Sequence, residues 1–175
     1  MFFEGGLANV PALFLPKRPM NTRTHQYRST MQAASNGPTV GGYAAVFNDI
    51  TDLGKMYERI EPGAFEGADM SDVRLLINHE GLALARTAAG TLGLIVDQRG
   101  LRYVATLPDT EQGNALAIAA RRGDVTQSSF AFTIAKQRFE QHEGKPLRII
   151  ESIGSVLDVS AVVYPAYKGT EFHAK

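Results

Sequence analysis

The residues of this sequence best suited to covalent chemistry are Ser129 and His79. A serine hydroxyl becomes a strong nucleophile only when a neighbouring base accepts its proton, and the histidine imidazole suits that task near neutral pH. Since the sequence contains no cysteine, a covalent nucleophile has to be a serine, a threonine, a lysine or a carboxylate. The first hypothesis is therefore a hydrolase in which Ser129 is the nucleophile and His79 is the general base.

His79 is selected by its position among the four histidines. The apolar run 73–78 predicts a buried strand that ends immediately before His79. In contrast, His25 lies in an irregular N-terminal stretch, His142 in a polar loop and His173 among the last three residues. Only His79 is expected at the end of a buried strand.

Ser129 lies in a segment, 128–134, that alternates between large apolar and small side chains. The large face carries Phe130, Phe132 and Ile134, and the small face carries Ser129, Ala131 and Thr133. We expect the large face to belong to the core. The small face leaves room for a second extended chain beside Ser129, which favours a peptide as the substrate.

A third member of the site would be a carboxylate that holds the imidazole in one tautomer and stabilises the imidazolium. Asp158 and Glu80 both qualify by sequence. Alternation along 157–163 places Asp158 on one face with Ser160, opposite Leu157, Val159 and Ala161. The pattern alone leaves a structural role open for every one of these residues, because most serines, histidines and acids at strands serve no chemistry.

The elements that must position these residues are mostly strands. We expect about seven, since the segment 147–152 leads into 157–163. The predicted strands cover 40–47, 57–60, 73–78, 91–97, 101–107, 128–135, 147–152 and 157–163. Gly81 is expected to close the segment that follows His79, and a short helical turn is expected at 64–66.

One helix is predicted over 111–122, where good helix formers follow Asp109 and Thr110, either of which can cap it. Gly123 suits the position after its last turn. The tripeptide Arg122-Gly123-Asp124 is therefore interpreted as a helix end and a turn, not as an adhesion motif. The fold class is mainly β with helices, α+β.

Composition is that of a folded domain, with 44% hydrophobic and 21% charged residues among 175. Residues 1–38 are expected to form an irregular leader, 39–170 the protein's single domain and 171–175 a short tail. The leader lacks a basic stretch that would make it a secretory signal. No apolar run approaches the ~20 residues that cross a bilayer.

The sequence has 18 Lys and Arg against 18 Asp and Glu, so no overall field attracts nucleic acid or anionic lipid. The expected partner is a protein or a small molecule. The scattered histidines show no metal-ligand spacing, and no cofactor motif is present.

Through a series of short sequence motifs, the chain resembles the prohead proteases of tailed bacteriophages. These are capsid-maturation serine endopeptidases, regarded as relatives of the herpesvirus assemblin proteases. The motifs are 42–47, 61–65, Asn78-His79, Arg86-Thr87, 90–92, 107–110, 122–124, 129–132, 158–160, 165–167 and Thr170. No single motif is specific to the family, but the motifs occur along the chain in the same order as in the family. The leader matches no pattern of the family.

The resemblance implies that His79 and Ser129 are the catalytic pair, with Ser128 a competitor by adjacency and Asp158 the third member. Two mild departures from the family pattern are Ala131, where glycine is common, and Asp158, where glutamate is common. The implied fold is a herpesvirus-protease-like antiparallel β-barrel with peripheral helices. Arg148 is a conceivable aid to the oxyanion hole and is left unassigned.

The implied activity is a serine endopeptidase that needs no cofactor and works in the host cytoplasm, inside the assembling prohead. It would cleave scaffold protein or the scaffold-like segment of the major capsid protein, and its own leader, in contact with those proteins and with the portal. A homodimer or higher homo-oligomer is expected. The alternatives are a non-catalytic capsid or scaffold-binding protein of the same fold and a barrel that encloses a small ligand.

Overall fold

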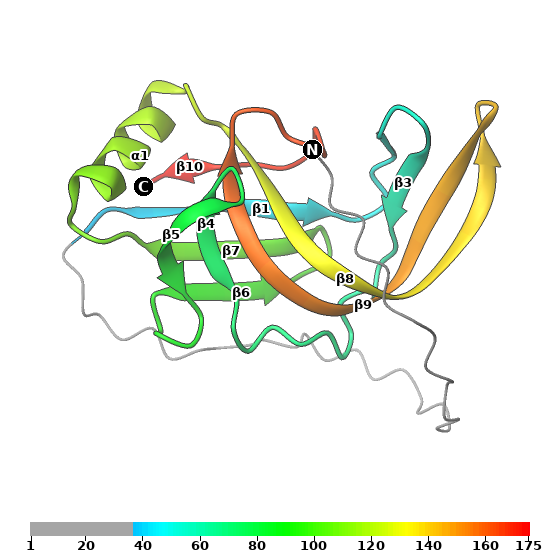
Figure 1. Ribbon diagram of the computed structural model, residues 1–175, viewed down its shortest axis with the longest axis horizontal. Helices are drawn as coiled ribbons and strands as arrows, with labels where there is room; N and C mark the ends of the chain where they lie inside the picture. Colours follow the sequence, from blue (N-terminus) through cyan, green and yellow to red (C-terminus); the bar gives the residue numbers. More distant parts are fainter. Residues whose placement is uncertain (1–36) are drawn as a thin grey trace.

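A computed structural model describes residues 37–175, which form two β-sheets and one α-helix (Figure 1). The four-stranded sheet has the order β10-β1-β7-β6, and all of its neighbours are antiparallel. Its strands are β1 (Thr39–Val46), β6 (Leu92–Val96), β7 (Gly100–Thr106) and β10 (His173–Ala174). This sheet lies on one side of the hydrophobic core.

The six-stranded sheet has the order β2-β3-β9-β4-β5, with β8 paired to β9. Its strands are β2 (Thr51–Asp52), β3 (Tyr57–Ile60), β4 (Arg74–Ile77), β5 (Glu80–Arg86), β8 (Gln127–His142) and β9 (Lys145–Val162). β9 is the axis of this sheet, since β3 pairs with its first part and β4 with its last part, both in parallel.

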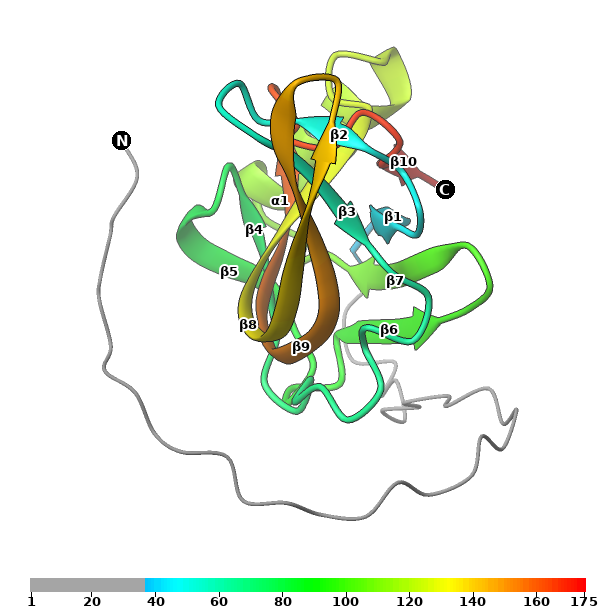
Figure 2. The same cartoon turned by 90° about the vertical axis from the view of Figure 1, so that its right-hand side faces the viewer.

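β8 and β9 form one long antiparallel hairpin, whose tip lies at the opposite end of the molecule from α1 (Glu111–Arg122) in Figure 1. Figure 2 shows how the two strands twist around each other. Its register shifts at several places, the first between Ala131 and Phe132, and such bulges bend and twist a strand pair. Leu157 is the extra residue at the first shift, and it is exposed. The prediction that Leu157 shares a face with Val159 and Ala161 is therefore wrong, because the bulge interrupts the alternation.

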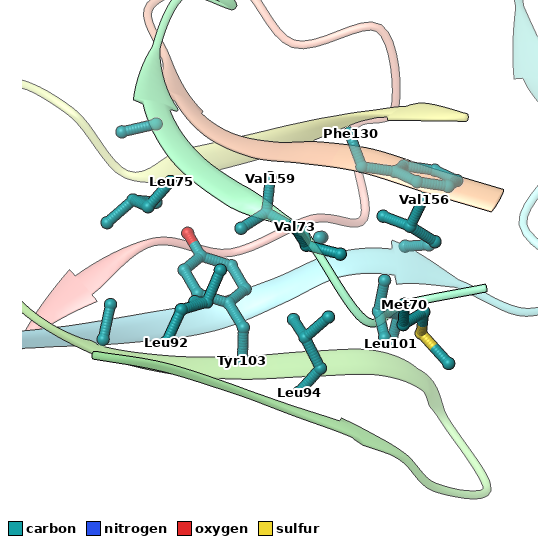
Figure 3. Packing of buried hydrophobic residues seen from close by; sticks show 14 of the residues in the cluster. Met70, Val73, Leu75, Leu92, Leu94, Leu101, Tyr103, Phe130, Val156 and Val159 are labelled. Atoms are coloured by element: carbon teal, nitrogen blue, oxygen red, sulfur yellow. The ribbon is translucent and has the colours of Figure 1, made fainter. Parts of the chain in front are cut away.

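The core lies between the two sheets (Figure 3). Leu92, Leu94, Leu101 and Tyr103 of the four-stranded sheet face Leu75, Phe130, Val156 and Val159 of the six-stranded sheet. The rings of Phe130 and Phe132 stack with their centroids 4.5 Å apart, so these two residues share a face as the sequence predicts.

The helix forms where the sequence places it. Thr110 is its N-cap, with its side chain accepting a hydrogen bond from the Gly113 N–H at 3.3 Å. Gly123 ends the helix in the left-handed conformation at φ 80°. Of the two predicted caps, Thr110 fills the position and Asp109 does not. Within residues 37–175, no helix is long and apolar enough to cross a membrane.

The mainly β fold with a helix is confirmed, but the barrel is not found. The hydrogen-bond ladders of residues 37–175 make two open sheets and one helix instead of a closed barrel with several helices. Two of the strand pairings are parallel, which a purely antiparallel arrangement does not have.

Several predicted boundaries also change. The segment 128–135 is the first half of β8, whereas 147–152 and 157–163 both fall in the single strand β9. His142 is the last residue of β8, not part of a loop. The expected tail, 171–175, contains β10, which pairs with β1. The expected leader, apart from residues 37 and 38, lies outside the described residues.

Candidate active site

His79 is placed by a two-residue turn that joins β4 to β5. Ile77 pairs with Glu80, and the residues between them, Asn78 and His79, have φ angles of 51° and 62°. Positive φ at both central residues defines a type I′ turn, which matches the twist of the strands it joins. The prediction that the segment closes at Gly81 is wrong, because the chain returns at once as β5 and Gly81 lies inside that strand.

Asn78 fixes this turn to the end of β9. Its backbone N–H donates to the Ala161 carbonyl at 2.9 Å, and its side-chain oxygen accepts a hydrogen bond from the Val163 N–H at 3.2 Å. The short polar side chain of asparagine tolerates the left-handed conformation better than most residues do. The turn therefore places His79 over β9, where its side chain remains 36% exposed.

Asp158 meets the imidazole there. The Nδ1 atom of His79 lies 2.7 Å from Oδ1 of Asp158, whose residue is 8% exposed. A carboxylate only accepts hydrogen bonds, so the proton of a neutral imidazole sits on Nδ1 and the lone pair on Nε2. Nε2 is then free to accept a proton. Glu80, the other candidate acid, is exposed on β5 and makes no ion pair within residues 37–175.

Ser129 lies on the same face of the sheet, one strand farther from His79. Ser129 is directly opposite Ser160 in the β8–β9 pair. Ser160 lies on the same face of β9 as Asp158, and the Ser160 hydroxyl donates to Oδ1 of Asp158 at 2.8 Å. Side chains opposite each other in such a pair have Cβ atoms about 5 Å apart. Ser129 is 7% exposed, and its hydroxyl makes no hydrogen bond with another residue of the described chain.

Ser128, the neighbouring serine, points to the opposite face. Its hydroxyl is 2.6 Å from the Tyr103 hydroxyl and donates to the Glu171 carbonyl at 2.7 Å, and the residue is completely buried. Burial raises the pKa of Tyr103, so this phenol stays protonated and is the donor to Ser128. A hydroxyl that is bonded on both sides and closed to solvent is unsuited to attack a substrate.

A comparison with protein-family models matches residues 24–175 to the caudovirus prohead serine protease family. The chain belongs to this family. It is therefore a serine protease of phage capsid maturation, which acts in association with the assembling capsid in the host cell. No curated protein and no solved structure matches the chain.

In this prohead protease, Arg148 is engaged away from Ser129. Its guanidinium pairs with the buried carboxylate of Glu58, which also accepts a hydrogen bond from the Tyr167 hydroxyl. Burial, together with the charge of Glu58, raises the pKa of Tyr167. Arg148 faces Phe139 in the hairpin, ten residues beyond Ser129 along β8, so this cluster braces the sheet and is no aid to an oxyanion hole.

An open groove lies between β5 and the first turns of α1. Its volume is about 580 Å³, and its lining consists of Leu82, Ala83, Leu84, Pro108, Thr110, Glu111, Gln112 and Ala115. None of the candidate catalytic residues lines it. Residues 37–175 contain no cluster of three or more histidine or acidic side chains arranged to hold a metal ion.

Sequence reasoning selected His79, Asp158 and Ser129 as candidates, but it did not single out Ser160, which contacts Asp158 and His79, or Asn78, which attaches the turn to β9. The alternation along β9 already placed Ser160 beside Asp158. The alternation could not show that β4 is the neighbour of β9 at this point, because β4 and the turn that carries His79 lie far from β9 in the sequence. Asn78 carried a local signal, since asparagine is favoured in type I′ turns.

Proposed function

We propose that this prohead protease is an endopeptidase in which Ser129 is the nucleophile, His79 the general base and Asp158 the acid that orients His79. The observation that carries the proposal is the contact of 2.7 Å between Nδ1 of His79 and Oδ1 of Asp158, with Ser129 on the same face one strand away. This contact leaves Nε2 as the basic atom on the imidazole.

The chemistry follows from that arrangement. The Ser129 oxygen bonds to the carbonyl carbon of a peptide while its proton passes to Nε2 of His79. The peptide C–N bond then breaks, and the same proton goes to the leaving amine. Water, deprotonated by His79, hydrolyses the ester on Ser129 and restores the enzyme. Asp158 stabilises the imidazolium that exists between these proton transfers.

An extended polypeptide fits the surroundings of Ser129. From Phe130 onward, the side of β8 that faces away from β9 is paired with no strand of the described chain. Ala131, two residues after Ser129, presents only a methyl group on the face of the site. We propose scaffold protein, or the scaffold-like segment of the major capsid protein, as the substrate, and the protein's own leader as a second one. A kinship with the assemblin proteases is part of the same proposal.

The test replaces one hydroxyl at a time. Ser129→Ala removes the nucleophile and Ser128→Ala is its matched control, because the two serines are adjacent but face opposite sides of the sheet. We expect a fluorophosphonate probe to label wild type and Ser128→Ala, and to leave Ser129→Ala unlabelled. The loss of activity against peptide substrate should be at least about a thousandfold.

The competing function is a non-catalytic capsid or scaffold-binding protein of the same fold. It predicts that neither wild type nor Ser128→Ala is labelled, even when co-expressed with capsid and scaffold proteins. Labelling that persists in Ser129→Ala but is lost in Ser128→Ala would transfer the nucleophile to Ser128. Mass spectrometry of the same samples shows whether residues within 1–38 are removed in a manner that depends on Ser129.

A further inference from the structure

Ser160 occupies an unusual position on β9, since it contacts both the acid and the base of the proposed site. Its hydroxyl donates to Oδ1 of Asp158 at 2.8 Å and accepts a hydrogen bond from the backbone N–H of His79 at 3.2 Å. The residue is completely buried, and it lies directly opposite Ser129 on β8. One hydroxyl therefore bonds to both His79 and Asp158, on a residue that is paired across the strands with Ser129.

The two hydrogen bonds are compatible because a serine hydroxyl has one proton and two lone pairs. The proton goes to the carboxylate, and a lone pair receives the His79 N–H. Oδ1 of Asp158 then has two donors, the Ser160 hydroxyl and Nδ1 of His79 at 2.7 Å. Two donors on one oxygen fix the rotation of the carboxyl group as well as its position.

Without this hydroxyl, the base would be held only by its contact with Asp158 and by the hydrogen bonds of Asn78 to β9. His79 stands on a turn in the left-handed conformation, and its side chain is 36% exposed. The neighbours of Ser160 along β9, Val159 and Ala161, are apolar and fully buried, so they offer no replacement acceptor. The loss of the Ser160 hydroxyl would leave the backbone N–H of His79 without its acceptor, and Oδ1 of Asp158 with one donor instead of two.

We propose that Ser160 is a positioning residue that holds His79 and Asp158 in one fixed relation, and this inference rests on the proposed serine protease function. Ser160 acts through the other two residues and does not take part in bond making. Its removal should slow the chemical step and leave substrate binding unchanged, because it is closed to solvent and cannot touch a substrate.

The test compares three replacements in the full chain. Ser160→Ala removes the hydroxyl, Ser160→Cys keeps the shape but offers only a weak donor and acceptor, and Ser160→Thr keeps the hydroxyl and adds a methyl group. Ser155→Ala is the control, because Ser155 lies on the same strand and its hydroxyl bonds to Thr133 instead of to the site. The probe is a fluorophosphonate, whose maximal labelling rate and half-saturating concentration are measured separately.

We expect the maximal labelling rate to fall about tenfold or more in Ser160→Ala, less in Ser160→Cys and least in Ser160→Thr, with little change in the half-saturating concentration. A purely structural role predicts a different order, since the isosteric cysteine disturbs packing least and the larger threonine most. Ser155→Ala should label like wild type.

A second readout does not depend on activity. The proton between Nδ1 of His79 and Asp158 should give a downfield proton resonance, which Ser160→Ala weakens or broadens and Ser160→Thr retains. Wild-type labelling and an intact resonance in folded Ser160→Ala, or a cysteine variant that labels faster than the threonine variant, would overturn the inference. If Ser129→Ala is still labelled, the proposed function fails instead, so the two failures are distinguishable.

Discussion

The turn that carries His79 predicts an unusual order of stability between two inactive variants. His79 has φ 62°, a conformation that costs residues with a Cβ atom about 1–2 kcal/mol. Glycine does not incur this cost, and Asn-Gly is the preferred sequence for a type I′ turn. We therefore expect His79→Gly to be more stable than His79→Ala, although alanine is the more stabilising residue at ordinary positions.

The magnitude follows from a difference in which most contributions cancel. Both variants lose the imidazole and leave Asp158 without this partner, so they share that destabilisation. What differs is the backbone strain of about 1–2 kcal/mol, which alanine keeps. Against it stands the greater freedom of glycine in the unfolded chain, about 0.4–1 kcal/mol. The net advantage of His79→Gly is about 0.5–1 kcal/mol, or about 2 °C in Tm for a chain of this size.

Urea denaturation and calorimetry of both variants measure this difference, with Ala83→Gly as the control. Ala83 lies on β5, close to the turn, and it is not among the residues with positive φ. There we expect glycine to destabilise by about 0.5–1 kcal/mol. Equal stability of the two His79 variants, or greater stability of His79→Ala, would refute the assigned turn. Both variants should lack protease activity.

Two further predictions concern groups around the site. Ser128→Ala leaves the buried hydroxyl of Tyr103 and the Glu171 carbonyl without their partner, so the free energy of unfolding should fall by about 1–3 kcal/mol. The activity per folded molecule should be unchanged. A free energy of unfolding in urea equal to that of wild type would contradict these contacts. The hydrogen bond from Arg86 lowers the pKa of Asp72, so this pair stabilises the protein above the unfolded value near ~3.9 and its contribution is lost in stronger acid. Asp72→Asn should therefore unfold more easily than wild type at pH 7, and the difference should shrink as the pH falls below ~3.9. A deficit that does not shrink in acid would exclude the ion pair as its cause.

The elements that sequence predicted correctly have strong local signals. The β6–β7 hairpin has a short connection that contains Gly100, and α1 has both Thr110 before it and Gly123 after it. Such signals act within a few residues, so they need no knowledge of the rest of the fold. β3 and β1 were likewise visible from their β-prone composition.

The elements that sequence missed depend on distant partners. The second half of β8 is polar and mostly exposed, a pattern that is typical of a loop. It is nevertheless a strand, because β9 pairs with it almost to the hairpin tip. β5 was missed because its turn has Asn78-His79 in place of the usual Asn-Gly, so the local signal was half present.

The candidate site shows the same division. Alternation placed Asp158 and Ser160 on one face and Ser129 on another strand, but it could not say which strands are neighbours. The contact of His79 with Asp158 arises because β4 pairs in parallel with the last part of β9, a pairing that no local pattern predicts. For the same reason, alternation alone could not choose between Asp158 and Glu80.

The register of β8 is what makes one of two adjacent serines reach the site, and Ser128 is suited to set it. A slip of one residue would exchange the faces of Ser128 and Ser129, because successive side chains of a strand point to opposite sides. Ser128 opposes such a slip through its hydroxyl, which bonds to Tyr103 and Glu171, and through its N–H, which donates to Thr170 at 3.2 Å. These partners lie on the core side and on the edge of β8, away from His79. Ser128 thus adds to the stability of the β8 register, which the long pairing of β8 with β9 also maintains in Ser128→Ala.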